Sequence, residues 1–219
     1  MGKFHTVAFD LDGTLADPTG GLTCGFKYAF KKMGLPCPDG EGLKKYIGPP
    51  LRDSFQRDFG LTDEQSNECV RLFREFFAVY GWWDNELYEG IPELLCALKQ
   101  GGKKILLATS KPQVFAEKIL KLFDIDKYFD VVGAATLDKS RENKEQVLRF
   151  VLSEAGICDE DRSGVVLVGD TRFDVEGARR VGISSLGVLW GFGSRRELLS
   201  EGADGVVKTV DELKRILLD

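Results

Sequence analysis

Two carboxylates, Asp10 and Asp12, follow an apolar run and directly precede Gly13. Like charges this close repel each other, so a folded protein tolerates them where a cation lies between them or where one carboxyl keeps its proton. Both arrangements suit chemistry on a phosphate ester: a carboxylate can attack phosphorus, and a carboxylic acid can protonate the leaving oxygen. Gly13 permits a sharp turn that brings backbone N–H groups close to phosphate oxygens. A helix cap followed by an ordinary Asp-Gly turn is the simpler alternative.

A second polar cluster, Thr109, Ser110 and Lys111, follows another apolar run. We expect a strand over 104–109, so the cluster lies where that strand ends and a helix begins. A hydroxyl donor and the N–H groups of a helix N-terminus are suitable partners for a phosphate oxygen. Capping of the helix by Thr109 or Ser110 explains this segment equally well when it is taken alone.

A third cluster, Asp170 and Asp174, follows the apolar run 165–168. Residues four apart lie one helical turn from each other, so both carboxylates can face the same site. Oxygen ligands of this type suit Mg²⁺, which takes few protein ligands and keeps several waters. The alternative is a pair of aspartates favoured by the positive end of a helix dipole.

One lysine stands between these clusters, at the start of a predicted helix. A cation is mildly unfavourable at a helix N-terminus, so the position of Lys144 is explained if it neutralises a phosphate or an aspartate. Lys139 and Arg141 are nearby competitors for this role.

Hydrophobic spacing predicts the elements that must carry these residues. Apolar residues recur at helical spacing over residues 18–88, whereas from residue 91 onward helices alternate with nearly continuous apolar strands. Such strands form a parallel sheet covered on both faces, with ligands at the carboxyl ends of the strands. We therefore expect an α/β core over 1–17 and 89–219, and an inserted all-helical domain over 18–88 that acts as a lid.

Composition excludes several classes of protein. The formal net charge is -5, so no basic surplus points to a nucleic-acid polymer as partner. The five cysteines are odd in number and never form a CxxC pair, which argues against a disulfide framework and a zinc site. His5 is the only histidine, and we expect it to be a buried structural residue of the first strand. Without a signal peptide or a membrane-length apolar run, a cytoplasmic location is expected.

The sequence resembles the haloacid dehalogenase superfamily, in the branch that is mostly phosphatases. Residues 9–15, Phe-Asp-Leu-Asp-Gly-Thr-Leu, are similar to its first motif, and the clusters around Thr109, Lys144 and Asp170 follow in the order of its other motifs. The resemblance covers essentially the whole chain. It implies a Rossmann-like core and a helical cap of the first type (C1), inserted after the first motif.

The resemblance also implies a role for each matching residue. Asp10 would be the nucleophile that becomes an aspartyl phosphate, and Asp12 the general acid/base. Thr109 and Lys144 would hold the phosphoryl group. Mg²⁺ would be the cofactor, with ligands from Asp10, Asp170 and the backbone carbonyl of Asp12, and with Asp174 supporting the site or bound to the ion through water. The further candidates for substrate binding are Gly13, Ser110, Lys111 and Arg52.

Within the superfamily the chain looks like the phosphoglycolate phosphatase and bacterial 5′-nucleotidase-like branch. The segments that carry this likeness are 46–51, 88–91, 108–112 and 187–194. The Thr-Ser-Lys-Pro sequence at 109–112, where phosphoglycolate phosphatases usually have Thr-Asn-Lys-Pro, favours the nucleotidase-like relatives. The expected substrate is a small phosphorylated metabolite, and the oligomeric state is not readable.

Other activities share these motifs. A phosphomutase of the same fold, similar to β-phosphoglucomutase, would have the same core residues and would depend on a bisphosphate activator. A non-catalytic binding protein would be expected to lose Asp10 or Asp12, and both are present. A dehalogenase is disfavoured because Asp12 and the Asp170/Asp174 pair serve phosphate and Mg²⁺ chemistry.

Overall fold

The computed structural model describes residues 3–44, 46–47, 51–138 and 140–219. The chain divides into two compact units, one formed by Met1–Asp17 with Leu87–Asp219 and the other by Pro18–Glu86. The chain passes between them through two short strands, β2 (Ala16–Asp17) and β3 (Glu86–Leu87), which pair as a separate two-stranded sheet.

The first unit contains a six-stranded parallel sheet with the strand order β5-β4-β1-β6-β7-β8. Its strands have these bounds: β1 Thr6–Phe9, β4 Lys104–Pro112, β5 Val131–Ala135, β6 Val165–Gly169, β7 Ser184–Val188 and β8 Gly205–Val207. Strand β1 lies between β4 and β6, so chain order reverses beside it, as in doubly wound folds. The prediction of a Rossmann-like α/β core is confirmed.

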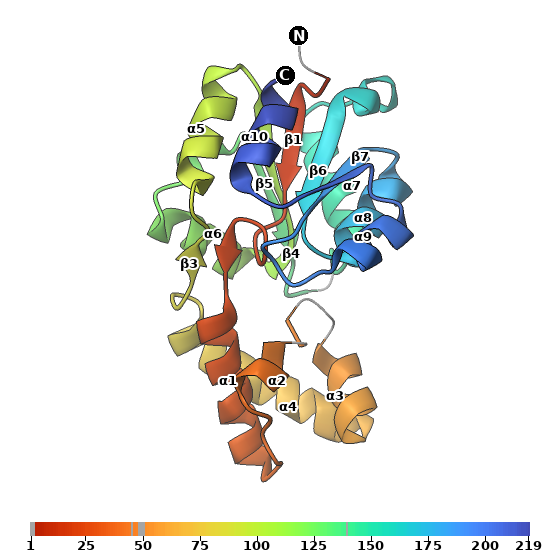
Figure 1. Cartoon of the computed structure of the whole chain (residues 1–219). Coiled ribbons are helices and arrows are strands. Elements are labelled where there is room, and N and C mark those ends of the chain that lie inside the picture. Colours follow the sequence, from red (N-terminus) through yellow and green to blue (C-terminus); the bar gives the residue numbers. More distant parts are fainter. Residues whose placement is uncertain (1–2, 45, 48–50, 139) are drawn as a thin grey trace. The chain divides into compact units, whose positions relative to one another are not determined.

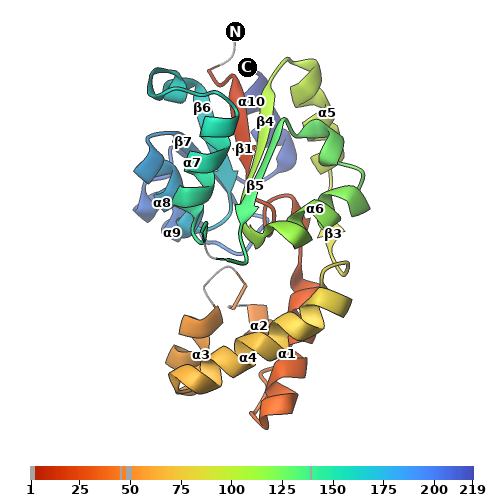
Figure 2. The same cartoon turned by 180° about the vertical axis from the view of Figure 1, so that it is seen from behind.

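Helices cover both faces of this sheet, as Figures 1 and 2 show from opposite sides. One face packs against α5 (Ile91–Gln100), α6 (Gln113–Leu122) and α10 (Val210–Leu218). The other face packs against α7 (Lys144–Glu154) and α8 (Arg172–Val181). The remaining elements of this unit are α9 (Arg195–Glu201) and two 3₁₀ turns, Asp126–Tyr128 and Asp159–Gly164.

Alternation along β1 explains why both faces must be covered. Val7 and Phe9 belong to the cluster under α5, α6 and α10, whereas Ala8 belongs to the cluster under α7 and α8. Successive side chains of a strand point to opposite faces, so a strand that is apolar throughout requires helices on both sides. All the residues of β1 are buried, and the strand ends at Asp10.

The second unit is helical. It contains α1 (Thr19–Met33), α2 (Gly40–Lys44), α3 (Leu51–Phe59) and α4 (Asp63–Phe76), followed by a π-helical turn at Phe77–Gly81. A capping box begins α4, because the Thr62 hydroxyl accepts the Gln65 N–H and the Gln65 side chain accepts the Thr62 N–H. The core of this unit is aromatic, with rings in edge or tilted contact: Phe26, Phe30, Tyr46, Phe55 and Phe73.

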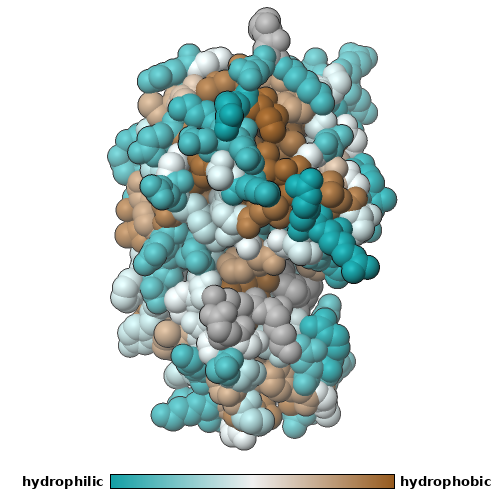
Figure 3. Space-filling view, in the orientation of Figure 1, coloured by the Kyte–Doolittle hydropathy of each residue, from teal (hydrophilic) through white to brown (hydrophobic). Residues whose placement is uncertain are grey.

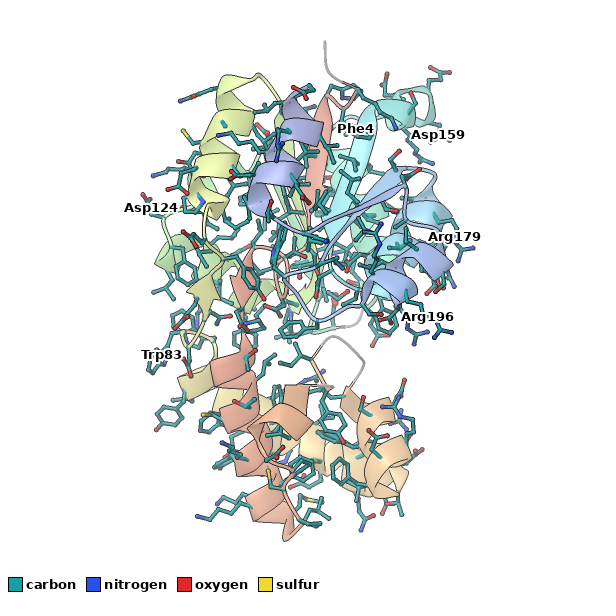
Figure 4. The ribbon with its side chains drawn as sticks, viewed as in Figure 1. Phe4, Trp83, Asp124, Asp159, Arg179 and Arg196 are labelled. Carbon is teal, nitrogen blue, oxygen red and sulfur yellow. The ribbon has the colours of Figure 1, made fainter. Side chains whose placement is uncertain are left out.

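The surface carries a few exposed apolar side chains. Hydrophilic residues cover much of the face seen in Figure 3. Trp83 is 54% exposed, and its side chain points away from the helices in Figure 4. Among the described residues, no helix is both long and apolar enough to cross a bilayer.

The structure corrects two predictions about local structure. His5 precedes β1 and is exposed, so the prediction of a buried strand histidine is wrong; the parallel ladder begins one residue later, at Thr6. Strand β4 does not end at Thr109. A shift in register after Thr109 allows Pro112 to pair with Ala135, and the following helix begins at Gln113.

Candidate active site

The predicted functional residues of the first unit meet at one edge of the sheet. Asp10 follows β1, Thr109 and Lys111 lie at the end of β4, and Asp170 follows β6. These strands are neighbours in the order β4-β1-β6, so their carboxyl ends bring the residues together. The backbone confirms the junction, since the N–H of Asp10 donates to the Val168 carbonyl at 2.9 Å.

Lys144 connects two of the carboxylates. It is the first residue of α7, it is buried, and its Nζ lies 2.8 Å from Asp10 Oδ1 and 2.8 Å from Asp174 Oδ1. The same Nζ donates to the Ala108 carbonyl at 2.7 Å. Gly177 of α8 makes room for this side chain, because a Cβ there would lie 2.5 Å from Lys144 Cγ. Lys139 lies outside the described residues. Arg141 donates to the Ala134 carbonyl and the Gln113 side chain.

Asp10, Asp170 and Asp174 form a group suited to a cation. Each offers a carboxylate oxygen, and these atoms lie within 4.8 Å of one another. All three carboxylates are buried. Among the described residues, one ammonium contacts the group, that of Lys144, and a single positive charge does not balance three carboxylates. A divalent cation with oxygen ligands would balance that excess, so the donor set fits Mg²⁺.

The pKa values reflect the same crowding. Burial is the main reason that the pKa of Asp10 rises to about 6; the charge of Asp174 acts in the same direction, and the Lys144 ammonium opposes both. Burial also raises the pKa of Asp170, helped by the charges of Asp174 and Asp10. Although burial lowers it, the pKa of Lys144 is raised overall by its two carboxylate partners. A cation among the carboxylates would favour their charged forms.

Asp12 has a different partner. Lys111 Nζ donates to both carboxylate oxygens of Asp12, at 2.8 Å each, and the Lys111 side chain is only 4% exposed. The backbone N–H of Lys111 also donates to Thr109 Oγ1 at 3.2 Å, which places the buried Thr109 beside this pair. Ser110, predicted to bind substrate, is exposed on the same strand.

Arg52, another predicted substrate contact, belongs to the helical unit. Its guanidinium lies 2.9 Å from Asp63, and the two side chains are 48% and 71% exposed. Residues 48–50 of the predicted branch motif lie outside the described residues.

The structure adds contacts that sequence reasoning did not identify. The Thr14 hydroxyl donates to Asp170 Oδ1 at 3.3 Å, and the backbone N–H of Phe192 donates to Asp170 Oδ2 at 2.8 Å. Gly13 lies against the same carboxylate, because a Cβ on Gly13 would overlap its oxygens. Segment 187–194 was singled out in the sequence as a branch signature, but a backbone donor within it leaves no mark in the residue types.

Comparison with known proteins agrees with this geometry. Residues 7–188 match the family model described as haloacid dehalogenase-like hydrolase. A 5′-nucleotidase from Pseudomonas aeruginosa is 36% identical over 98% of this chain and 96% of its own length. The tyrosine-protein kinase PtkA from Mycobacterium tuberculosis is 36% identical over 96% of this chain and 72% of its own length.

Solved structures give the same result. A haloacid dehalogenase-like family hydrolase from Streptococcus pneumoniae matches with a TM-score of 0.88 and 30% identity, covering 96% of this chain and 97% of that one. The family match spans the strand ends near Asp10, Thr109 and Asp170 and the start of α7 at Lys144. The chain therefore belongs to the haloacid dehalogenase-like hydrolase family.

Proposed function

We propose that this protein is a Mg²⁺-dependent phosphatase that hydrolyses a small phosphomonoester through an aspartyl-phosphate intermediate. The observation that carries the proposal is the convergence of Asp10, Asp170 and Asp174 around Lys144 at the end of the central strand. A carboxylate at this position can act as a nucleophile once its charge is balanced and a phosphoryl group is held beside it.

The carboxylates of Asp10, Asp170 and Asp174 and the backbone carbonyl of Asp12 would hold the Mg²⁺ ion. When bound, the ion would supply charge stabilisation to the phosphoryl oxygens and reduce repulsion between the phosphate and Asp10. The residues fit this role because the donor atoms are all oxygen and the described charges leave a negative excess.

In the first half-reaction, a carboxylate oxygen of Asp10 attacks phosphorus and forms an acyl-phosphate bond. The bond from phosphorus to the ester oxygen breaks, and Asp12 gives its proton to that leaving oxygen. Lys144 and the Thr109 hydroxyl hold the phosphoryl oxygens, and the position of Lys144 beside Asp10 supports this assignment.

In the second half-reaction, Asp12 takes a proton from water as the water oxygen attacks phosphorus. The bond between phosphorus and Asp10 breaks, which releases inorganic phosphate and restores the Asp10 carboxylate. Asp12 ends protonated, as it began, so the cycle closes without another reactant.

We further propose that Met1–Asp17 with Leu87–Asp219 is the catalytic core and that Pro18–Glu86 is a cap that selects the substrate. The core residues described above deal only with the phosphoryl group, so the rest of the substrate must be recognised elsewhere. A 5′-nucleotide is the leading substrate class because the Pseudomonas aeruginosa relative is named a 5′-nucleotidase, and phosphoglycolate is the second.

Phosphate release tests the proposal. Wild-type protein and Asp10→Asn are compared with Mg²⁺ and with EDTA, on 5′-nucleotides, phosphoglycolate, sugar phosphates and an aryl phosphate. We expect Mg²⁺-dependent release that falls by at least about 10⁴-fold in Asp10→Asn, as for loss of a covalent nucleophile. Equal release by a folded Asp10→Asn variant would end the nucleophile assignment.

A different phosphoryl acceptor is the second candidate. One relative with 36% identity is named a tyrosine-protein kinase, and transfer to a hydroxyl uses the same first steps as transfer to water. Slow phosphate release with a long-lived phosphoenzyme would favour such an acceptor. Stimulation by a sugar bisphosphate would indicate a mutase. Transfer of the phosphoryl group to a tyrosine peptide would indicate a kinase.

A further inference from the structure

The connection that follows β7 is packed against the carboxylate of Asp170. The Phe192 N–H donates to Asp170 Oδ2 at 2.8 Å, and the indole Nε1 of Trp190 donates to the Thr14 carbonyl at 3.0 Å. Thr14 in turn donates to the other oxygen of Asp170, at 3.3 Å. This stretch, residues 190–193, is called the WGFG loop below.

The WGFG loop is also fixed by its glycines. A Cβ on Gly191 would overlap the Gly13 carbonyl and lie 2.5 Å from Asp170 Cβ, and a Cβ on Gly193 would overlap the Asp170 carbonyl. Backbone this close to Asp170 on two sides leaves the carboxylate little freedom to rotate.

The two oxygens of the Asp170 carboxylate accept hydrogen bonds of different length, 2.8 Å at Oδ2 and 3.3 Å at Oδ1. Asp170 Oδ2 is taken by the Phe192 N–H. At Asp174, Oδ2 accepts from the Thr171 N–H and hydroxyl at 3.0 and 2.8 Å, and Oδ1 lies 2.8 Å from Lys144 Nζ. The backbone of the WGFG loop therefore holds Oδ2 of Asp170, and Oδ1, which accepts the longer Thr14 bond, is the oxygen that a cation can take.

The number of carboxylate oxygens that can bind the cation affects Mg²⁺ and Ca²⁺ differently. Mg²⁺ requires a compact octahedral shell and takes carboxylates through single oxygens, whereas Ca²⁺ takes more oxygen ligands and readily binds both oxygens of a carboxylate. Partners that orient a metal ligand typically change metal affinity by about 10- to 100-fold.

We propose that the WGFG loop is a positioning device that restricts Asp170 to one metal-binding oxygen and so makes the site select Mg²⁺ over Ca²⁺. The inference rests on the proposed function only in placing the cation at Asp170. It assigns a role to a segment whose residues carry no metal-binding side chain.

The test measures metal affinity directly. Calorimetric titrations of the full chain with Mg²⁺ alone and with Ca²⁺ alone give the ratio of the two affinities for wild type, Phe192→Pro and Phe192→Ala. Proline removes the N–H that holds Asp170, whereas alanine removes only the side chain and keeps the N–H.

We expect the preference for Mg²⁺ over Ca²⁺ to fall by at least about tenfold in Phe192→Pro and to stay at the wild-type value in Phe192→Ala. A general structural defect would weaken both ions alike and leave the ratio unchanged. Gly191→Ala, which pushes the loop from Asp170, provides a second variant if the proline variant does not fold, and the same fall in the ratio is expected.

An unchanged ratio in folded Phe192→Pro or Gly191→Ala would overturn the inference, as would a wild-type protein that binds Ca²⁺ as well as Mg²⁺. These outcomes are distinct from failure of the proposed function. A wild-type protein that selects Mg²⁺ but releases no phosphate would overturn the phosphatase proposal and leave the role of the loop intact.

Discussion

Asp10 has a pKa of about 6 in the folded protein because burial disfavours its charged form. Between about pH 4 and pH 6 the folded state therefore binds more protons at this residue than the unfolded state does. Stability contributed by the neutral form is present at the lower end of this range and is lost as the pH rises through the folded-state pKa. The difference corresponds to at most about 3 kcal/mol.

We expect the metal-free protein to become more stable, relative to Asp10→Asn, as the pH falls from about 7 to about 5. Asparagine does not titrate, so the variant lacks this contribution. Melting temperatures of both proteins in EDTA, followed by circular dichroism, check the prediction. Mg²⁺ should reduce the pH dependence of the wild type, because the cation favours the charged carboxylate. Parallel pH profiles for the two proteins in EDTA would contradict it.

Lys111 was predicted to bind substrate, but the structure places its Nζ 2.8 Å from both oxygens of Asp12. Lys111→Met should therefore lower kcat by about 10- to 100-fold, because Asp12 loses the partner that holds its carboxylate. Lys111→Arg should recover part of the loss, since a guanidinium can also donate two parallel hydrogen bonds. Steady-state kinetics on an aryl phosphate and on a 5′-nucleotide measure this.

The same kinetics separate the two roles of Lys111. A substrate contact would appear as a raised KM with kcat unchanged, and that result would support the prediction that Lys111 binds substrate.

At the scale of elements, the contact between α7 and α8 decides where Lys144 lies. Gly177→Ala should cost about 1–3 kcal/mol of stability and displace Lys144, because the new Cβ would lie 2.5 Å from Lys144 Cγ. The displacement of Lys144 should also lower the rate of phosphate release. The matched control is Gly182→Ala, at the end of the same helix: its φ is 73°, no atom lies within 4 Å of the added Cβ, and only stability should change.

Chemical denaturation and phosphate release per folded molecule check this pair of variants. If Gly177→Ala releases phosphate at the wild-type rate, activity tolerates the displacement of Lys144. If Gly182→Ala loses all phosphate release, the loss in Gly177→Ala does not come from the local contact with Lys144.

The elements show what the sequence could predict. Continuous apolar runs specify buried parallel strands, so the strand ends before Asp10 and Asp170 and the presence of a strand leading to Thr109 followed from hydrophobic pattern alone. The extension of β4 to Pro112 did not, because it depends on a shift in register against β5. The donor at Phe192 is a backbone N–H that every residue except proline carries, so no residue type marks it.

At the scale of the whole molecule, the first unit holds the candidate catalytic residues and the second is proposed to select the substrate. The first brings together residues from segments far apart in the chain, such as Asp10 and Asp174, and their neighbourhood follows from the parallel sheet. The second is a helical unit with an aromatic core, whose proposed role in substrate choice requires comparing substrates that share the phosphoryl group and differ elsewhere.

The positions of Asp10 after β1, Asp170 after β6 and Asp174 in α8 have a mechanical consequence. A cation shared by Asp10, Asp170 and Asp174 would add a link between the carboxyl ends of two adjacent strands, beside the backbone hydrogen bond from Asp10 to Val168 and the Lys144 contacts with Asp10 and Asp174. Amide hydrogen exchange measured with and without Mg²⁺ should then show slower local opening at Asp10 and Gly169 than at the opposite end of the same strands. Equal slowing along both strands would mean that the ion stabilises the fold only globally. If exchange slows only at Asp10 and Gly169, the bound ion acts as a cross-link between the carboxyl ends of β1 and β6. Loss of the ion would then allow these ends to open before the rest of the sheet.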